Sequence, residues 1–191
     1  MIHEVIVTTQ YEDGNTHIAP MGIRHENQHY IISPFKPSAT LDNIQREKHA
    51  VINHVNDVRV FAGCLTGRKN WPLIDCDKII GKRLECALSH LELQLDYIEE
   101  DELRPNFYMQ LIHSHNHKPF TGFNRAQSAV LELAILVSRL DMLPEEKIRN
   151  ELQYLTIAIE KTAGEHEQTA WQWLIDKVRV HEQETKKELI A

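Results

Sequence analysis

The sequence lacks the features that would assign it to several common classes of protein. It has three cysteines, Cys64, Cys76 and Cys86, and no CxxC pair of the kind found in zinc sites or redox motifs. No apolar stretch approaches the length of a membrane span, and the amino terminus has no basic segment followed by an apolar core. We therefore expect reduced thiols and a cytosolic protein.

Charge and motifs exclude further classes. The 191 residues carry 21 basic and 28 acidic side chains, a net charge of -7, and no basic run that could follow a nucleic-acid backbone. The patterns GxSxG and GxxxxGK[ST] do not occur, so nucleophile-elbow hydrolases and P-loop enzymes have no support. We expect neither nucleic acid nor a membrane as a partner.

The hydrophobic pattern changes its period once along the chain. Segments with the composition or alternation of strands occur at residues 2–9, 16–25, 29–33, 49–55, 91–97 and 106–115, with a helix expected from Ser38 to Glu47. From Asn124 the apolar residues fall at helical spacing and predict three helices up to about residue 187. The predicted fold class is α+β: an antiparallel barrel domain over residues 1–120 and a helical subdomain over residues 121–191, packed on the barrel.

The run from Pro34 to Ile44 has the residue types of a phosphate site. Lys36 supplies a positive charge, while the hydroxyls of Ser38 and Thr40 and the amide of Asn43 supply hydrogen bonds. Ser38 or Thr40 can also cap the following helix, whose first N–H groups favour an anion. The alternative is an ordinary capped helix after an edge strand.

The run Asn-Thr-His-Ile-Ala-Pro-Met-Gly at residues 15–22 is unusual for a paired strand. Pro20 cannot donate to a ladder and Gly22 has no side chain, so we expect a sheet edge or a bulge. Backbone groups between Ala19 and Gly22 would bond the rim of a flat aromatic ligand, with Met21 on its face. A bulge that only curves the barrel is the alternative.

These two runs, with Ala-Val-Ile-Asn at residues 50–53 and Gly-Phe-Asn-Arg-Ala at residues 122–126, carry a resemblance that spans most of the chain. The sequence resembles an uncharacterised archaeal and bacterial family of split-barrel flavoproteins, related to flavin reductase-like and pyridoxamine-phosphate-oxidase-like proteins. The resemblance implies a split barrel, FMN as cofactor and a homodimer with the cofactor near the subunit interface. That family is often discussed alongside tetrahydromethanopterin-linked one-carbon metabolism, and its activity is undefined.

The resemblance also implies site residues. It puts the FMN phosphate against Lys36, Ser38, Thr40 and Asn43, and makes Asn53 a contact to the ring or the ribityl chain. It puts the isoalloxazine beside the strand residues Ala19, Pro20, Met21 and Gly22. Relatives tend to have glycine where this chain has Pro37, which removes one N–H donor and would weaken phosphate binding.

Asn124 and Arg125 stand at the start of the first long helix and are further candidate cofactor residues. Asn124 suits the cap position, whereas a cation such as Arg125 is disfavoured in a first helical turn. Arg125 would therefore reach an anion such as the cofactor or a substrate. Pairing with Glu132 or another surface carboxylate is the alternative.

A competing interpretation rests on the histidines of the strand at 106–115. His113, His115 and His117 are two residues apart, so on a strand they share a face and three imidazoles can converge on one metal ion. A solvated strand end is the alternative, because the run stops at Lys118-Pro119.

Three functions follow from these observations. The first is an FMN-binding oxidoreductase or flavin carrier with no catalytic side chain assigned, since the flavin performs the chemistry. The second is a non-catalytic module that binds FMN or another phosphorylated ligand. The third is a metal-dependent hydrolase that uses the three histidines.

Overall fold

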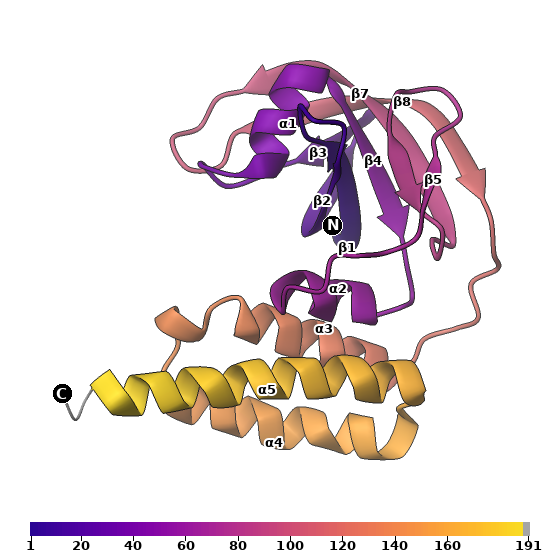
Figure 1. Cartoon of the computed structure of the whole chain (residues 1–191). Coiled ribbons are helices and arrows are strands. Elements are labelled where there is room, and N and C mark those ends of the chain that lie inside the picture. Colours follow the sequence, from indigo (N-terminus) through magenta and orange to yellow (C-terminus); the bar gives the residue numbers. More distant parts are fainter. Residues whose placement is uncertain (189–191) are drawn as a thin grey trace. The chain divides into compact units, whose positions relative to one another are not determined.

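The computed structural model describes the backbone of residues 1–188 and the side chains of residues 1–185. The chain forms two compact units (Figure 1). The barrel unit comprises residues 1–56 and 70–120, and the helical unit comprises residues 57–69 and the chain from Thr121 onward.

The barrel unit is built from long antiparallel strands. Its strands close in the order β1-β2-β3-β8-β7-β4, and every neighbouring pair is antiparallel. Their bounds are β1 Ile2–Gln10, β2 Thr16–Glu26, β3 His29–Ile32, β4 His49–His54, β7 Ser89–Glu99 and β8 Asn106–Asn116. The predicted antiparallel barrel is thereby confirmed.

Alternation along the strands fills the barrel with apolar side chains. The interior side chains are fully or nearly fully buried and include Val5, Val7, Ile23, Ile32, Ala50, Ile52, Leu93, Phe107 and Met109. Because residues paired across antiparallel strands point to the same face, the partners of Val5 and Val7 on β2, Met21 and Ala19, also point inward. Pro20 and Gly22 point to the outer face.

Helix α1, Ala39–Glu47, lies between β3 and β4 in the chain. Its cap is Ser38, whose hydroxyl accepts a hydrogen bond from the N–H of Leu41. The helix ends at Lys48, which has a left-handed backbone with φ of 62°. Leu41 and Ile44 pack against the barrel core, and the predicted helix is present.

A short two-stranded sheet covers part of the outer face of the barrel. It consists of β5, Leu73–Asp75, and β6, Lys82–Leu84. The Thr8 hydroxyl donates to the carbonyl of Lys82 at 2.6 Å, and the N–H of Leu84 donates to Asn53 Oδ1 at 2.7 Å. The segment around this sheet is therefore held to β1 and β4 by polar bonds.

This cover corrects one sequence-based prediction. The alternation of leucine with polar residues at 91–97 is typical of a half-buried strand and would put Glu92 on the solvent side, but Glu92 is fully buried. Backbone N–H groups of Asp77, Lys78 and Ile79 close over its carboxylate at 2.6, 2.8 and 2.9 Å. A polar position in an alternating strand is buried here because a distant segment supplies its hydrogen bonds.

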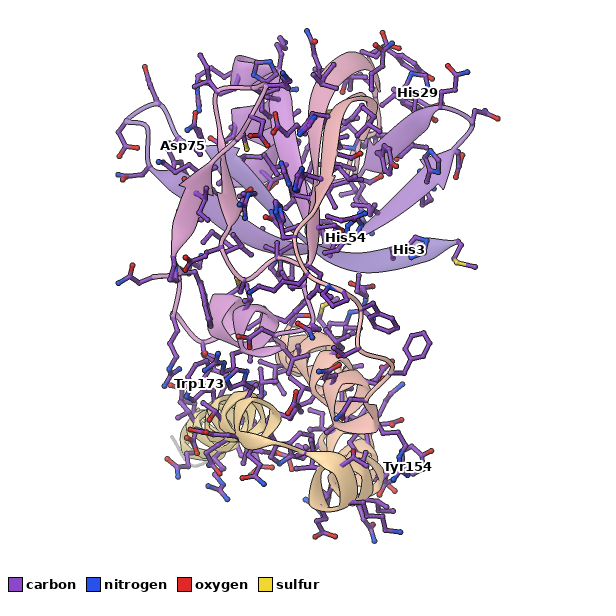
Figure 2. The ribbon with its side chains drawn as sticks, turned by 90° about the vertical axis from the view of Figure 1, so that its right-hand side faces the viewer. His3, His29, His54, Asp75, Tyr154 and Trp173 are labelled. Carbon is purple, nitrogen blue, oxygen red and sulfur yellow. The ribbon has the colours of Figure 1, made fainter. Side chains whose placement is uncertain are left out.

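The helical unit contains four α-helices within the described residues. They are α2 Arg59–Leu65, α3 Arg125–Val137, α4 Glu145–Thr162 and α5 Glu165–Glu188, with a 3-10 turn at Leu140–Met142. Apolar residues from all four helices share one core, including Ala62, Val130, Leu133, Leu155 and Leu174. Tyr154 projects from α4 into solvent, as Figure 2 shows. Among these helices, none is long and apolar enough to cross a membrane.

Candidate functional site

The candidate ring site lies on β2, where one edge of the strand has no partner. β2 pairs with β1 from Thr16 to Arg24 without a register shift, whereas β3 pairs only with residues from Ile23 to Glu26. Over residues 16–22 the second side of β2 therefore has no strand partner within the described part of the chain. Of the two options for Pro20, an edge and a bulge, the structure has the edge.

The residues at this edge are neither fully buried nor fully exposed. Ala19, Pro20, Met21 and Gly22 are all half-buried, and Met21 packs against the barrel core. A Cβ at Gly22 would lie 2.9 Å from Ile2 Cγ2, so the side chain of Ile2 is a local reason for glycine. The Thr16 hydroxyl at the start of the edge is buried and has no hydrogen-bond partner among the described residues.

The start of α1 offers backbone donors for an anion. Ser38 Oγ accepts a hydrogen bond from the N–H of Leu41, and the Ser38 carbonyl accepts one from the N–H of Asp42. The N–H groups of Ala39 and Thr40 have no acceptor within the helix, because they belong to its first turn. These two donors fit a phosphate oxygen.

Lys36 is near an acidic loop in this structure. Its Nζ donates to Glu100 Oε2 at 2.9 Å and to the carbonyl of Asp101 at 3.0 Å. An ammonium has three N–H groups, so one remains for a ligand. The Asp101 carboxylate accepts hydrogen bonds from the backbone N–H groups of Arg104 and Leu103, and these bonds are the main cause of its lowered pKa. A negative charge therefore persists beside Lys36.

The structure buries three of the residues predicted to bind the cofactor. Thr40 is 3% exposed and Asn43 1% exposed, and the Asn43 amide bonds Thr9 Oγ1 and Arg46. Asn53 is fully buried: its amide donates toward Ile6 and Thr8, and its oxygen accepts from Leu84 N–H. The Asn43 and Asn53 side chains stabilise the barrel unit through their own hydrogen bonds, and the contact of all three residues with FMN stays a prediction.

A cavity of about 590 Å³ opens beside α1 in the barrel unit. It is lined by Glu12, Asp13 and Asp42 together with Tyr11, Asn15, Ala39, Asn43 and Arg46. Three carboxylates face one guanidinium, and Arg46 already donates to Gln10, Asn43 and Glu47. The acidic lining makes this cavity a poor phosphate site.

Asn124 and Arg125 belong to the helical unit. Asn124 caps α3 as predicted, because its Oδ1 accepts from the N–H groups of Ala126 and Gln127, and its amide donates to the carbonyl of Thr162. Arg125 is exposed and has no ion pair within the described residues, so the alternative, a pair with Glu132 or another surface carboxylate, is not formed there. Their role toward a cofactor stays a prediction.

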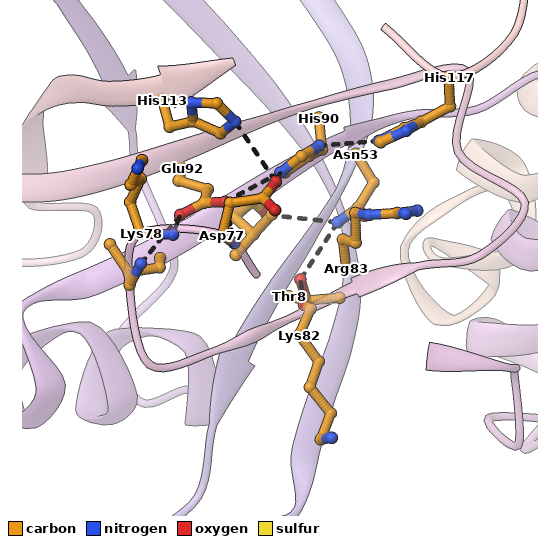
Figure 3. Close-up of polar contacts among 12 residues, drawn as sticks. Thr8, Asn53, Asp77, Lys78, Lys82, Arg83, His90, Glu92, His113 and His117 are labelled. Atoms are coloured by element: carbon orange, nitrogen blue, oxygen red, sulfur yellow. Dashed lines mark hydrogen bonds and ion pairs between the residues drawn. The ribbon is translucent and has the colours of Figure 1, made fainter. Parts of the chain in front are cut away.

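His113 and His115 on β8 and His117 just after it do not form a group of potential metal ligands among the described residues. His115 and His117 stack on each other, with ring centroids 4.8 Å apart. His117 Nε2 lies 2.9 Å from His90 Nδ1, and burial is the largest cause of the lowered pKa of His117, followed by the charges of Arg83 and His90. Among the described residues, the one group of potential metal ligands that includes His113 joins it to Asp77, His90 and Glu92 (Figure 3).

Comparison with family models covers most of the sequence. Residues 3–118 match the model described as "Protein of unknown function (DUF447) N-terminal domain", and residues 124–176 match the one described as "Protein of unknown function (DUF447)". The chain belongs to the DUF447 family. A comparison of this DUF447 chain with curated proteins gave no match.

Solved structures agree with the barrel architecture. An FMN-bound DUF447 protein from Methanosarcina mazei matches with a TM-score of 0.78 and 21% identity, over 92% of this chain and 94% of that one. A flavoredoxin from Methanosarcina acetivorans has a TM-score of 0.54 and 13% identity, over 62% of this chain and 74% of its own. An NADH:FAD oxidoreductase from Streptomyces globisporus has a TM-score of 0.53 and 9% identity, over 61% of this chain and 71% of its own. The DUF447 chain thus has the flavin reductase-like barrel fold with a helical carboxy-terminal part.

Proposed function

We propose that this DUF447 protein binds FMN and acts as an oxidoreductase or a flavin carrier. The observation that carries the proposal is the unpaired edge of β2 over residues 16–22, in a fold shared with an FMN-bound member of the same family. An open edge offers backbone N–H and C=O groups in a row, which suits the polar rim of a flavin ring. When bound, the flavin supplies hydride or electron transfer.

The residues of this chain would bind and orient the cofactor. The half-buried residues Ala19 to Gly22 would lie along the ring, and the N–H groups of Ala39 and Thr40 would hold the phosphate. Lys36 would add one charge-assisted hydrogen bond through its remaining N–H. Its exposed partner Glu100 would compete for the same ammonium.

The proposal includes a homodimer with the cofactor near the subunit interface. The barrel unit exposes several large apolar side chains that a second copy would cover, namely Phe35, Tyr97, Leu103, Leu111 and Ile112. A partner subunit or the ligand would also supply a hydrogen bond to the buried Thr16 hydroxyl. The connection with tetrahydromethanopterin-linked metabolism, like the cytosolic location, stays a prediction.

Flavin titration followed by a turnover assay tests the proposal. We expect FMN fluorescence to be quenched on addition of the purified protein, with one FMN per chain, and reduced nicotinamide to be oxidised when FMN is present. FMN binding without oxidation of reduced nicotinamide would support the flavin carrier and argue against the oxidoreductase. A protein that leaves FMN fluorescence unchanged and stays colourless would refute both.

A further inference from the structure

Four potential metal ligands converge beneath the segment that covers the outer face of the barrel (Figure 3). One nitrogen or oxygen atom from each of Asp77, His90, Glu92 and His113 lies within 4.8 Å of all the others. His90 Nε2 is 3.1 Å from Glu92 Oε1, and Asp77 Oδ2 is 3.3 Å from His113 Nε2 and 3.9 Å from His90 Nε2. Neighbouring ligand atoms of a tetrahedral zinc ion lie about 3.3 Å apart, so these separations are close to those of a metal site.

The strand pairing brings the ligands together from distant parts of the sequence. Glu92 on β7 pairs with His113 on β8, and His90, two residues before Glu92, points to the same face. Asp77 comes from the covering segment, whose N–H groups at residues 77–79 bind the Glu92 carboxylate. The backbone of the ligand-bearing segment is thus fixed before any ion binds.

The buried half of the cluster already has the hydrogen bonds that orient metal ligands. His90 and Glu92 side chains are both fully buried. The second ring nitrogen of His90, Nδ1, lies 2.9 Å from His117 Nε2, so Nε2 is directed toward the carboxylates. Metal-bound histidines usually make such a bond with the nitrogen that does not bind the metal.

The charges also match a divalent cation. Two carboxylates and two neutral imidazoles around a 2+ ion give a neutral site, which suits a buried position. The Glu92 side chain accepts three backbone N–H bonds, from Asp77, Lys78 and Ile79, and such bonds favour the carboxylate form. Arg83 is a cation whose charge acts on His117 and Cys76 in this region, and it would oppose the ion.

We propose that Asp77, His90, Glu92 and His113 bind a divalent first-row transition-metal ion of the zinc or cobalt type. Two nitrogen and two oxygen ligands suit such ions better than magnesium or calcium, which prefer oxygen alone. The ion is bound by Nε2 of a neutral His90 whose proton is on Nδ1, facing His117 Nε2, and it ties the covering segment to β7 and β8. The site faces solvent on the side of Asp77 and His113, whose side chains are partly exposed. It is independent of the FMN proposal.

The test uses the full-length protein after treatment with EDTA. Zn²⁺ is titrated against a chromophoric chelator, and Co²⁺ is added separately to record its visible absorption bands, with flavin absorbance subtracted. Asp77→Asn and His113→Ala remove partly exposed ligands, and His115→Ala is the matched control on the same strand. We expect one tightly bound ion in the wild type and in His115→Ala, and at least 10-fold weaker binding in the two ligand variants.

Two results would overturn the proposal. One is a wild-type protein that binds no stoichiometric Zn²⁺ and shows no tetrahedral Co²⁺ spectrum, a measurement that does not depend on the folding of any variant. The other is a loss of affinity in His115→Ala as large as in His113→Ala, with Asp77→Asn unaffected, since the β8 histidines would then hold the ion. FMN titration of the same samples keeps this test separate, because we expect FMN affinity to be unchanged in all variants.

Discussion

The sharpest prediction concerns the proposed bond between Lys36 and the FMN phosphate. A charge-assisted hydrogen bond contributes about 1.5–3 kcal/mol. In this structure Lys36 Nζ already binds Glu100 Oε2 at 2.9 Å, and the Glu100 side chain is 67% exposed. Such an exposed pair stabilises by about 0–1 kcal/mol, so sharing the ammonium costs little. We expect Lys36→Ala to lose about 1–2 kcal/mol of FMN binding, or about 5- to 30-fold in Kd.

The assay compares FMN with riboflavin, which has the same ring and lacks the phosphate. Fluorescence titration should show that Lys36→Ala weakens FMN binding and leaves riboflavin binding within about twofold. Glu100→Gln should tighten FMN binding modestly, because the competing carboxylate is removed. Lys147→Ala, an exposed position on α4, is the control for a lost positive charge. An unchanged ratio of FMN to riboflavin affinity in Lys36→Ala would refute the phosphate contact.

Three further predictions follow from buried groups. Asn53→Ala should cost about 2–4 kcal/mol of unfolding free energy in a denaturant titration, because it leaves the Leu84 N–H unpaired and opens a cavity; a smaller cost would point to a role outside the core. Glu92→Gln, measured with EDTA present, should cost about 1–3 kcal/mol at pH 7. Since the folded pKa of Glu92 lies below its ordinary 4.5, this difference should shrink as pH falls below 4.5, and a pH-independent difference would contradict the argument. Burial raises the pKa of Cys64 to about 11 and that of Cys76 to about 12, so alkylation of Cys64 at pH 8 should be about 100-fold slower in the folded than in the unfolded chain, as followed by mass spectrometry.

The sequence predicted helices and strands well where the signal is carried by a few neighbouring residues. The Ser38 cap and the helix after it, the Asn124 cap and the strand at 49–55 are present as expected, because capping and alternation depend on neighbouring residues. At Pro20 the sequence left a sheet edge and a bulge open, since proline cannot donate to a sheet in either, and the strand pairing decided for the edge. The small sheet β5–β6 was missed, because its three-residue strands lie in a segment with glycine and proline signals.

The candidate sites were less predictable, because their contacts join residues far apart in the sequence. Lys36 meets Glu100 across 64 positions, and nothing near Lys36 in the sequence reveals that competitor. The alternation of β7 marked Glu92 as a solvent-facing residue, whereas the covering segment at 77–79 buries it. The histidine spacing on β8 suggested a metal site, but only the pairing of β7 with β8 shows that His113 has Asp77, His90 and Glu92 as companions.

The sequence by itself determined the type and order of the main elements, the apolar barrel interior and the family. Those properties follow from the period of the hydrophobic residues, the caps and motifs carried by contiguous residues. Only the tertiary structure decided which polar side chains can bind a ligand and which already make hydrogen bonds within the protein. Burial and hydrogen-bond partners are set by segments that return from elsewhere in the chain, as residues 77–84 do over Asn53 and Glu92.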